Sequence, residues 1–181
     1  VERGRHLLDF DLANFVENGE STPWGRYYDH TSRAFALWLI SREGRGGDLF
    51  DRVYAKRKEI PLYARLQLMS AAHKLGRTGE RDALLKDLRA RVTETARTAH
   101  FAESTSQAEA EGLQLLMHSN VQTDAIALMA LLEISPDDPL LPKVMAGILD
   151  DRDPQRGGRW GTTHANAWAL LAASRYFKVV E

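Results

Sequence analysis

Six histidines are the first residues in this sequence that could do chemistry, either as metal ligands or as proton carriers. No two of them stand in a His-x-x-x-His or His-Glu-x-x-His arrangement, so the sequence holds no preformed zinc motif. Folding can still bring distant histidines together, but we interpret each one as an ordinary surface or hydrogen-bonded side chain. We therefore assign no catalytic residue, no cofactor-binding residue and no metal ligand. The six are His6, His30, His73, His100, His118 and His164.

A short acidic run, with Asp150, Asp151 and Asp153 around Arg152, is a second candidate. Oxygen-rich loops can hold calcium. The spacing matches no EF-hand, however, and Arg152 adds a positive charge, so the pattern favours a solvated loop.

Paired carboxylates could also hydrolyse a glycosidic bond. The candidates are Asp29, Asp124 and Glu133, but nothing in the sequence singles out two of them. Two glycine pairs, Gly46-Gly47 and 157–158, lack the context of a phosphate-binding loop, and they predict turns.

The amino-acid composition excludes several classes of function. The 181 residues include 24 Lys+Arg and 25 Asp+Glu, which gives a formal net charge of −1, and 44% are hydrophobic. This is typical of one globular domain, and the charge disfavours a nucleic-acid or membrane-surface binder. The absence of cysteine excludes disulfides, thiolate metal sites and a cysteine nucleophile. We expect a chain that begins at Val1 to be a piece of a longer protein.

Four Ala-rich apolar segments predict the elements that would position any site. They cover residues 32–39, 62–68, 123–130 and 165–171, and they align on Ala34, Ala64, Ala125 and Ala167. Apolar residues lie on more than one face of each, which is typical of buried helices. We therefore predict that the four aligned alanines are deeply buried.

One-sided amphipathic helices are predicted between these segments, at about residues 48–56, 79–96 and 139–149. Alternating buried and one-sided helices indicate an all-α fold, a partial α/α toroid with inner and outer helix layers. For residues 99–117 two structures remain open: a small β-hairpin insert, with strands at 99–102 and 113–117, or a continued helix through 107–116.

The most specific segment, residues 157–171, reads Gly-Gly-Arg-Trp-Gly-Thr-Thr-His-Ala-Asn-Ala-Trp-Ala-Leu-Leu. It is a glycine turn and an aromatic plug followed by a Thr-capped helix. It resembles the last helix entry of the thioester domain in bacterial α2-macroglobulin-like proteins, with His164 in place of the usual Gln. Residues 34–44 and 64–76 resemble two further helices of that family. The motif residues are Gly157, Gly158, Trp160, Gly161, Thr162, Thr163, His164 and Trp168.

The resemblance implies that residues 28–177 are the C-terminal part of a thioester-like toroid, after an irregular lead-in at 1–27. Residues 178–181 would begin a following domain. It implies a non-catalytic role in a broad-spectrum protease trap, which acts by packing against neighbouring macroglobulin domains and enclosing target proteases. It also implies a periplasmic location, in a parent protein that is lipid-anchored in some members.

The Cys-Gly-Glu-Gln-like thioester motif of the family is not in this sequence. Either the motif lies upstream of Val1, or the parent belongs to the subgroup without the cysteine. Two other functions stay open: a toroid glycoside hydrolase or cyclase, and a helical-repeat scaffold that binds a partner.

Overall fold

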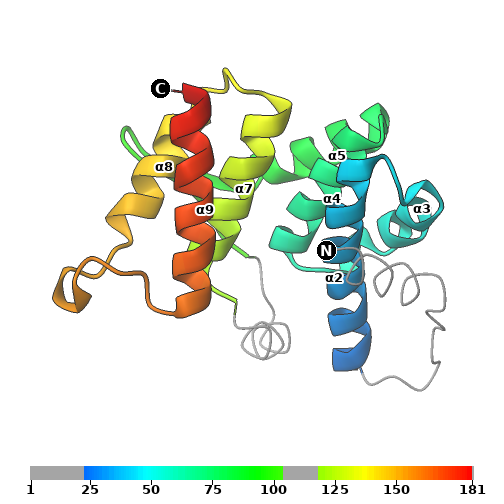
Figure 1. The fold of residues 1–181 in the computed structure, drawn as a ribbon, viewed down its shortest axis with the longest axis horizontal. Coiled ribbons are helices and arrows are strands. Elements are labelled where there is room, and N and C mark those ends of the chain that lie inside the picture. Colours follow the sequence, from blue (N-terminus) through cyan, green and yellow to red (C-terminus); the bar gives the residue numbers. More distant parts are fainter. Residues whose placement is uncertain (1–22, 104–117, 181) are drawn as a thin grey trace.

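A computed structural model describes residues 23–103 and 118–180, and of residues 23–29 it describes the backbone alone (Figure 1). The fold is all-α, as the sequence predicted. Among the described residues there are seven α-helices, three short 3-10 helices and one two-stranded sheet. The α-helices are α2 (Pro23–Ile40), α3 (Gly47–Ala55), α4 (Leu62–Lys74), α5 (Thr78–Arg89), α7 (Asn120–Ile134), α8 (Leu140–Asp150) and α9 (Thr163–Val180).

Four helices form an inner row in the order α2, α4, α7, α9, each packed against the next. All four contain one of the Ala-rich segments. In Figure 1, α2, α7 and α9 run in the same direction, from bottom to top. The two ends of the row also meet, since the ring centroids of Trp38 on α2 and Trp168 on α9 lie 5.9 Å apart.

The other helices cover this row from outside and complete the alternation that the sequence predicted. Helix α3 packs on α2 and α4, α5 packs on α4, and α8 packs on α7. Helix α8 runs opposite to α7 and α9 in Figure 1. Inner helices joined by reversed outer ones are the unit of an α/α toroid, but the described residues form only part of such an array, so the partial α/α toroid stays a prediction.

Three of the four aligned alanines are buried as predicted. Ala34, Ala64 and Ala125 are fully inaccessible to solvent. The prediction was wrong for Ala167, which is exposed, while Ala165 and Ala169 face the core. The alignment placed α9 two residues out of register, because an alanine on either side of Asn166 fits the same apolar pattern.

The chain after α5 differs from the prediction of a helix through residue 96. Helix α5 ends at Arg89, and Val92 lies in strand β1 (Val92–Glu94), which pairs antiparallel with β2 (Ala99–Phe101). Strand β2 matches the predicted strand at 99–102, and its partner among the described residues is β1. The predicted strand at 113–117 and the competing helix at 107–116 lie outside the described residues. Threonine and valine favour the pleated backbone that a partner strand offers, and this outweighs the helical spacing of Val92.

The predicted domain boundaries differ from the helix boundaries of the structure at both ends of the chain. Most of the lead-in at 1–27 lies outside the described residues, and residues 23–27 already belong to α2. Residues 178–180, which we assigned to the start of a following domain, form the last turn of α9. No helix among the described residues is long and apolar enough to span a membrane.

Candidate functional site

A carboxylate at the centre of α7 is the most deeply buried charged group that the structure describes. The Asp124 side chain has no solvent exposure. Its Oδ1 accepts a hydrogen bond of 2.7 Å from the Phe101 amide, and its Oδ2 lies 2.9 Å from Nδ1 of His100. Burial raises the pKa of Asp124 to about 6, although these hydrogen bonds act in the opposite direction.

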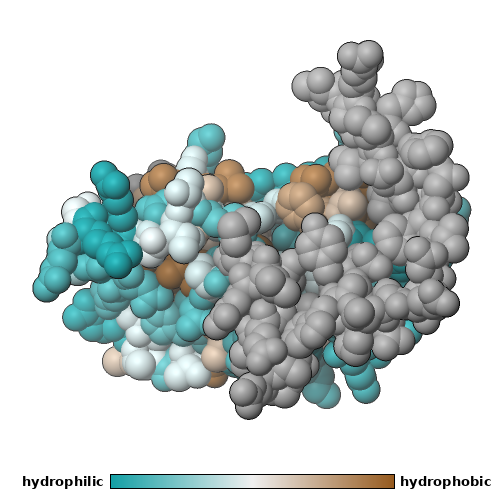
Figure 2. All heavy atoms as spheres, turned by 90° about the horizontal axis from the view of Figure 1, so that it is seen from below, coloured by the Kyte–Doolittle hydropathy of each residue, from teal (hydrophilic) through white to brown (hydrophobic). Residues whose placement is uncertain are grey.

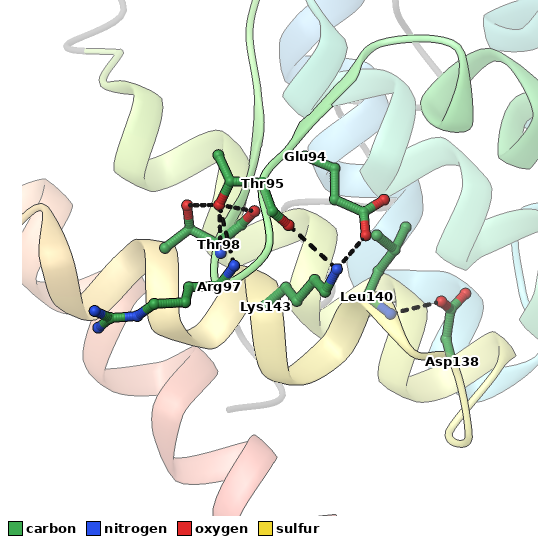
Figure 3. Close-up of polar contacts among 7 residues, drawn as sticks. All are labelled: Glu94, Thr95, Arg97, Thr98, Asp138, Leu140 and Lys143. Atoms are coloured by element: carbon green, nitrogen blue, oxygen red, sulfur yellow. Dashed lines mark hydrogen bonds and ion pairs between the residues drawn. The ribbon is translucent and has the colours of Figure 1, made fainter.

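The hairpin brings His100 to this carboxylate. His100 lies opposite Thr93 in the register of β1 and β2. Lys143 on α8 holds the hairpin down, since its Nζ contacts the Glu94 carboxylate and donates 3.2 Å to the Thr95 carbonyl (Figure 3). The Thr95 and Thr98 hydroxyls are also hydrogen-bonded across the turn.

A glycine on α8 makes room for the imidazole. A Cβ at Gly147 would lie 2.7 Å from Cε1 of His100 and 2.9 Å from the Ala99 carbonyl oxygen, which is too close for either contact. Residue 147 must therefore lack a side chain if β2 is to rest on α8. The start of α8 is fixed by Asp138, whose Oδ1 accepts a hydrogen bond of 3.0 Å from the Leu140 amide (Figure 3).

Asp151 completes this group one helical turn after Gly147. One ligand atom from each of His100, Asp124 and Asp151 can be chosen so that all three lie within 4.8 Å of one another. The sequence analysis treated these three residues separately, as a scattered histidine, a hydrolase candidate and part of a solvated loop. They are 24 and 27 residues apart along the chain, and only the hairpin unites them. No signal in the sequence could have joined them without knowledge of the β1–β2 pairing.

A second buried polar cluster lies at the N-terminal ends of α4 and α7. The Glu103 carboxylate accepts hydrogen bonds from the Leu62 and Tyr63 amides, at 2.7 and 3.0 Å, and so caps α4. His118 stacks on the Tyr63 ring, and its Nε2 lies 2.8 Å from the Thr123 hydroxyl. Burial lowers the pKa of His118 to about 4, so this imidazole is neutral at pH 7.

The glycine–tryptophan motif forms the connection from α8 to α9. Gly157 and Gly158 have φ of 70° and 73°, and the buried Trp160 donates 2.6 Å from Nε1 to the Ile148 carbonyl. The Thr162 hydroxyl accepts a hydrogen bond from the Ala165 amide and caps α9, as predicted. Nε1 of Trp168 donates 2.9 Å to Nε2 of His164, and the Trp168 ring also meets Trp38 on α2, while Gly161 and Thr163 are exposed. The motif therefore anchors α9 on α8.

An apolar surface covers the outward side of α9. We call it the α9 apolar face, and its exposed members are Leu170, Leu171, Phe177, Val179 and Val180. Leu170 keeps 61% of its surface exposed, whereas the buried stripe of the same helix is limited to Ala165, Ala169, Ala172 and Tyr176. Figure 2, seen from below, shows small separate apolar groups, in brown, among teal and white residues, and the end with the loop after α8 is teal. Leu170 and Phe177, seven residues apart, lie on the same side of the helix, and exposed apolar side chains that gather in this way indicate an interaction site.

Of the hydrolase candidates, Asp124 and Glu133 do not form a catalytic pair. Asp124 and Glu133 lie nine residues apart on α7, which places them about 13.5 Å apart along its axis, beyond the roughly 5–9.5 Å of a glycosidase pair. Glu133 is instead ion-paired with Arg42, in the 3-10 helix Ser41–Glu43 after α2, at 3.3 Å and with Arg175 on α9 at 3.5 Å. The Asp29 side chain lies outside the described side chains.

The other candidates lie apart from these groups. His30 is buried on α2, and its Nε2 lies 4.0 Å from Glu59. His73 lies half-buried near the end of α4, and His6 is outside the described residues. Asp153 caps the 3-10 helix Pro154–Arg156 by accepting a hydrogen bond from the Gln155 amide, and Asp150 is exposed.

Comparisons of the chain with family models, with curated proteins and with solved structures give no match. The all-α class therefore rests on the structure itself. The resemblance to the thioester domain stays a prediction from the residues quoted above.

Proposed function

We propose that this chain is a non-catalytic part of a thioester-like domain in a bacterial α2-macroglobulin-like protease trap. In this proposal it acts in the periplasm and works by packing against neighbouring macroglobulin domains, which close around a target protease. The resemblance supplies the class of protein, and the α9 apolar face is the observation that supports a packing role.

The α9 apolar face fits a neighbouring domain of the same protein because it is large, apolar and built on a firmly anchored helix. Five apolar side chains stay exposed on α9, although the same helix buries its alanine stripe against α7. Burial of apolar surface stabilises an interface by about 25 cal/mol per Å², and a face that stayed in water would contribute nothing. A helix fixed by Trp160, Thr162 and Glu133 presents that surface without a further ordering cost.

The packing of the inner row also favours a structural role over a toroid enzyme. Every residue from 121 to 132 on α7 is buried, and Ala64 and Ala125 are fully enclosed. The described inner helices therefore fill the centre with side chains. A partner-binding scaffold remains the alternative, and it would use the same α9 apolar face for a separate protein.

The test uses the full-length natural protein with Leu171→Glu and Leu170→Glu together. A trap shields a captured protease from a protein-sized substrate but leaves a small peptide substrate accessible. We expect the natural protein to show this size-dependent protection and the double variant to lose most of it. Ala83→Glu, at an exposed position on α5, places one such negative charge on an outer helix and should protect like the natural protein.

Two results would overturn the proposal. In the first, the natural protein fails to protect the protein-sized substrate from the protease, so that it is not a trap. Alternatively, the double variant could protect as well as the Ala83→Glu control, which would remove the α9 apolar face from the mechanism.

A further inference from the structure

We propose that His100, Asp124 and Asp151 form a binding site for one divalent transition-metal ion, with Zn²⁺ as its representative. The three side chains come from β2, from the middle of α7 and from the residue after α8, and their ligand atoms lie within 4.8 Å of one another. This inference does not depend on the proposed function, because it concerns a different region from the α9 apolar face.

The geometry of the group suits a small cation. Zinc binds imidazole nitrogen and carboxylate oxygen at about 2.0–2.2 Å, so two tetrahedral ligand atoms are about 3.3 Å apart. The distance from His100 Nδ1 to Asp124 Oδ2 is 2.9 Å. A metal ion that enters between them takes the place of the proton in this hydrogen bond, and that proton leaves to solvent. The exposed Asp151 side chain supplies the third ligand by a small rotation.

One side of the site is rigid. Asp124 is fully enclosed, and its second oxygen is held by the Phe101 amide, so the carboxylate is oriented before any ion arrives. Gly147 provides the flat helix surface on which the imidazole rests. A cation would also compensate the cost of keeping a carboxylate away from water, which the His100 hydrogen bond offsets only in part.

The other side of the site is open to water. Asp151 is exposed and the His100 side chain keeps 36% of its surface, so an ion can reach the group and retain water in its remaining coordination positions. One nitrogen and two carboxylate oxygens favour Zn²⁺ over Mg²⁺ and Ca²⁺, because these two ions prefer six or more oxygen ligands.

Isothermal titration of the metal-free chain with Zn²⁺ tests the site, with Co²⁺ absorption as a second readout of the coordination geometry. We expect one equivalent to bind and the cobalt complex to show the visible bands of a four- or five-coordinate ion. Asp151→Ala should weaken Zn²⁺ binding tenfold or more, and His100→Gln should abolish the cobalt spectrum. Mg²⁺ and Ca²⁺ at equal concentration should not compete.

Asp150→Ala is the matched control. It removes an adjacent exposed carboxylate that lies outside the group, and it should bind Zn²⁺ like the natural chain. Circular dichroism of all variants checks that the fold is retained. The proposal is wrong if the natural chain shows no saturable binding of one equivalent, or if Asp151→Ala and Asp150→Ala bind equally.

Discussion

Helices α7 and α9 have similar Ala-rich sequences but opposite surroundings. All residues from 121 to 132 on α7 are buried, whereas α9 buries one stripe of four residues and exposes five large apolar side chains. The cause is the number of neighbours, since α7 packs against α4, α8, α9 and β2, and α9 packs mainly against α7. An Ala-rich apolar pattern therefore predicts a helix that can be buried, but the fold decides whether it is.

The largest expected effect follows from truncating a leucine on each helix. Leu128 on α7 has no exposure, and Leu128→Ala should lower the free energy of unfolding by about 3 kcal/mol, because it removes buried surface and leaves a cavity. Leu170→Ala on α9 should change it by less than about 0.5 kcal/mol. Urea unfolding followed by circular dichroism measures both, and equal losses would remove the contrast between the two helices.

A change of pH tests the polar cluster that opens α7. Because the pKa of His118 is lowered to about 4 from 6.5, the folded state binds fewer protons than the unfolded state between these values. The contribution of His118 to stability is therefore complete above pH 6.5 and is lost as pH falls to about 4, up to about 3 kcal/mol.

Asp124, with its pKa raised to about 6, contributes the opposite slope, since its ionisation destabilises the folded state as pH rises from about 4 to 6. The measurement is therefore the difference in unfolding free energy between the natural chain and His118→Gln, in which the Asp124 contribution cancels. This difference should grow in favour of the natural chain from pH 4 to 6.5, in chelator-containing buffer. A difference independent of pH would show that His118 is not desolvated.

Two glycines compare a closely packed contact, at Gly147 on α8, with an open surface, at Gly79 on α5. Gly147→Ala should destabilise by about 1–3 kcal/mol, because the new Cβ would overlap His100 and the Ala99 carbonyl. Gly79→Ala on α5 meets nothing within 4 Å and should stabilise by about 0.5 kcal/mol through helix propensity. Thermal unfolding of the two variants checks the opposite signs, and a stabilising Gly147→Ala would contradict the close approach of β2.

The smallest effect concerns the ion pairs. Glu133→Gln removes the carboxylate that joins Arg42, just after α2, to Arg175 on α9, and it should cost about 1 kcal/mol because these groups are half-buried. Glu59→Gln removes a pair with the exposed Lys56, and it should cost less than about 0.5 kcal/mol. Chemical unfolding at low salt measures both, and equal costs would mean that Glu133 does not tie the row together.

The sequence predicted which segments are helices better than it predicted what each helix packs against. The four Ala-rich helices and the Thr cap of α9 follow from local patterns, and the structure contains all of them. Val92 was misassigned because its spacing suits a helix, whereas its strand pairing depends on residues further along the chain. The prediction was wrong for Ala167 because the alanines on either side of Asn166 fit the same apolar pattern, and only the packing of α9 shows that Ala165 is the one that faces the core.

The candidate sites show the same limit. The hydrogen bond by which Glu103 caps α4 comes from the Tyr63 amide, 40 residues earlier in the chain. The His100–Asp124–Asp151 group depends on a hairpin that rests on Gly147. The glycine–tryptophan motif could be recognised because its turn and its Thr162 cap are local, whereas the contacts of Trp160 with Ile148 and of Trp168 with Trp38 could not be predicted. The exposure of the α9 apolar face could not be predicted, since a buried and an exposed leucine look alike in a sequence.

Hydrogen–deuterium exchange on the 181-residue chain alone and on the full-length natural protein tests the central claim most directly. In the chain alone, α7 should exchange slowest and α9 markedly faster. In the full-length protein α9 should become as protected as α7, while α5 stays unchanged, because the α9 apolar face is then covered by a neighbouring domain. Equal protection of α7 and α9 in the chain alone, or an α9 that exchanges equally fast in both proteins, would contradict the account.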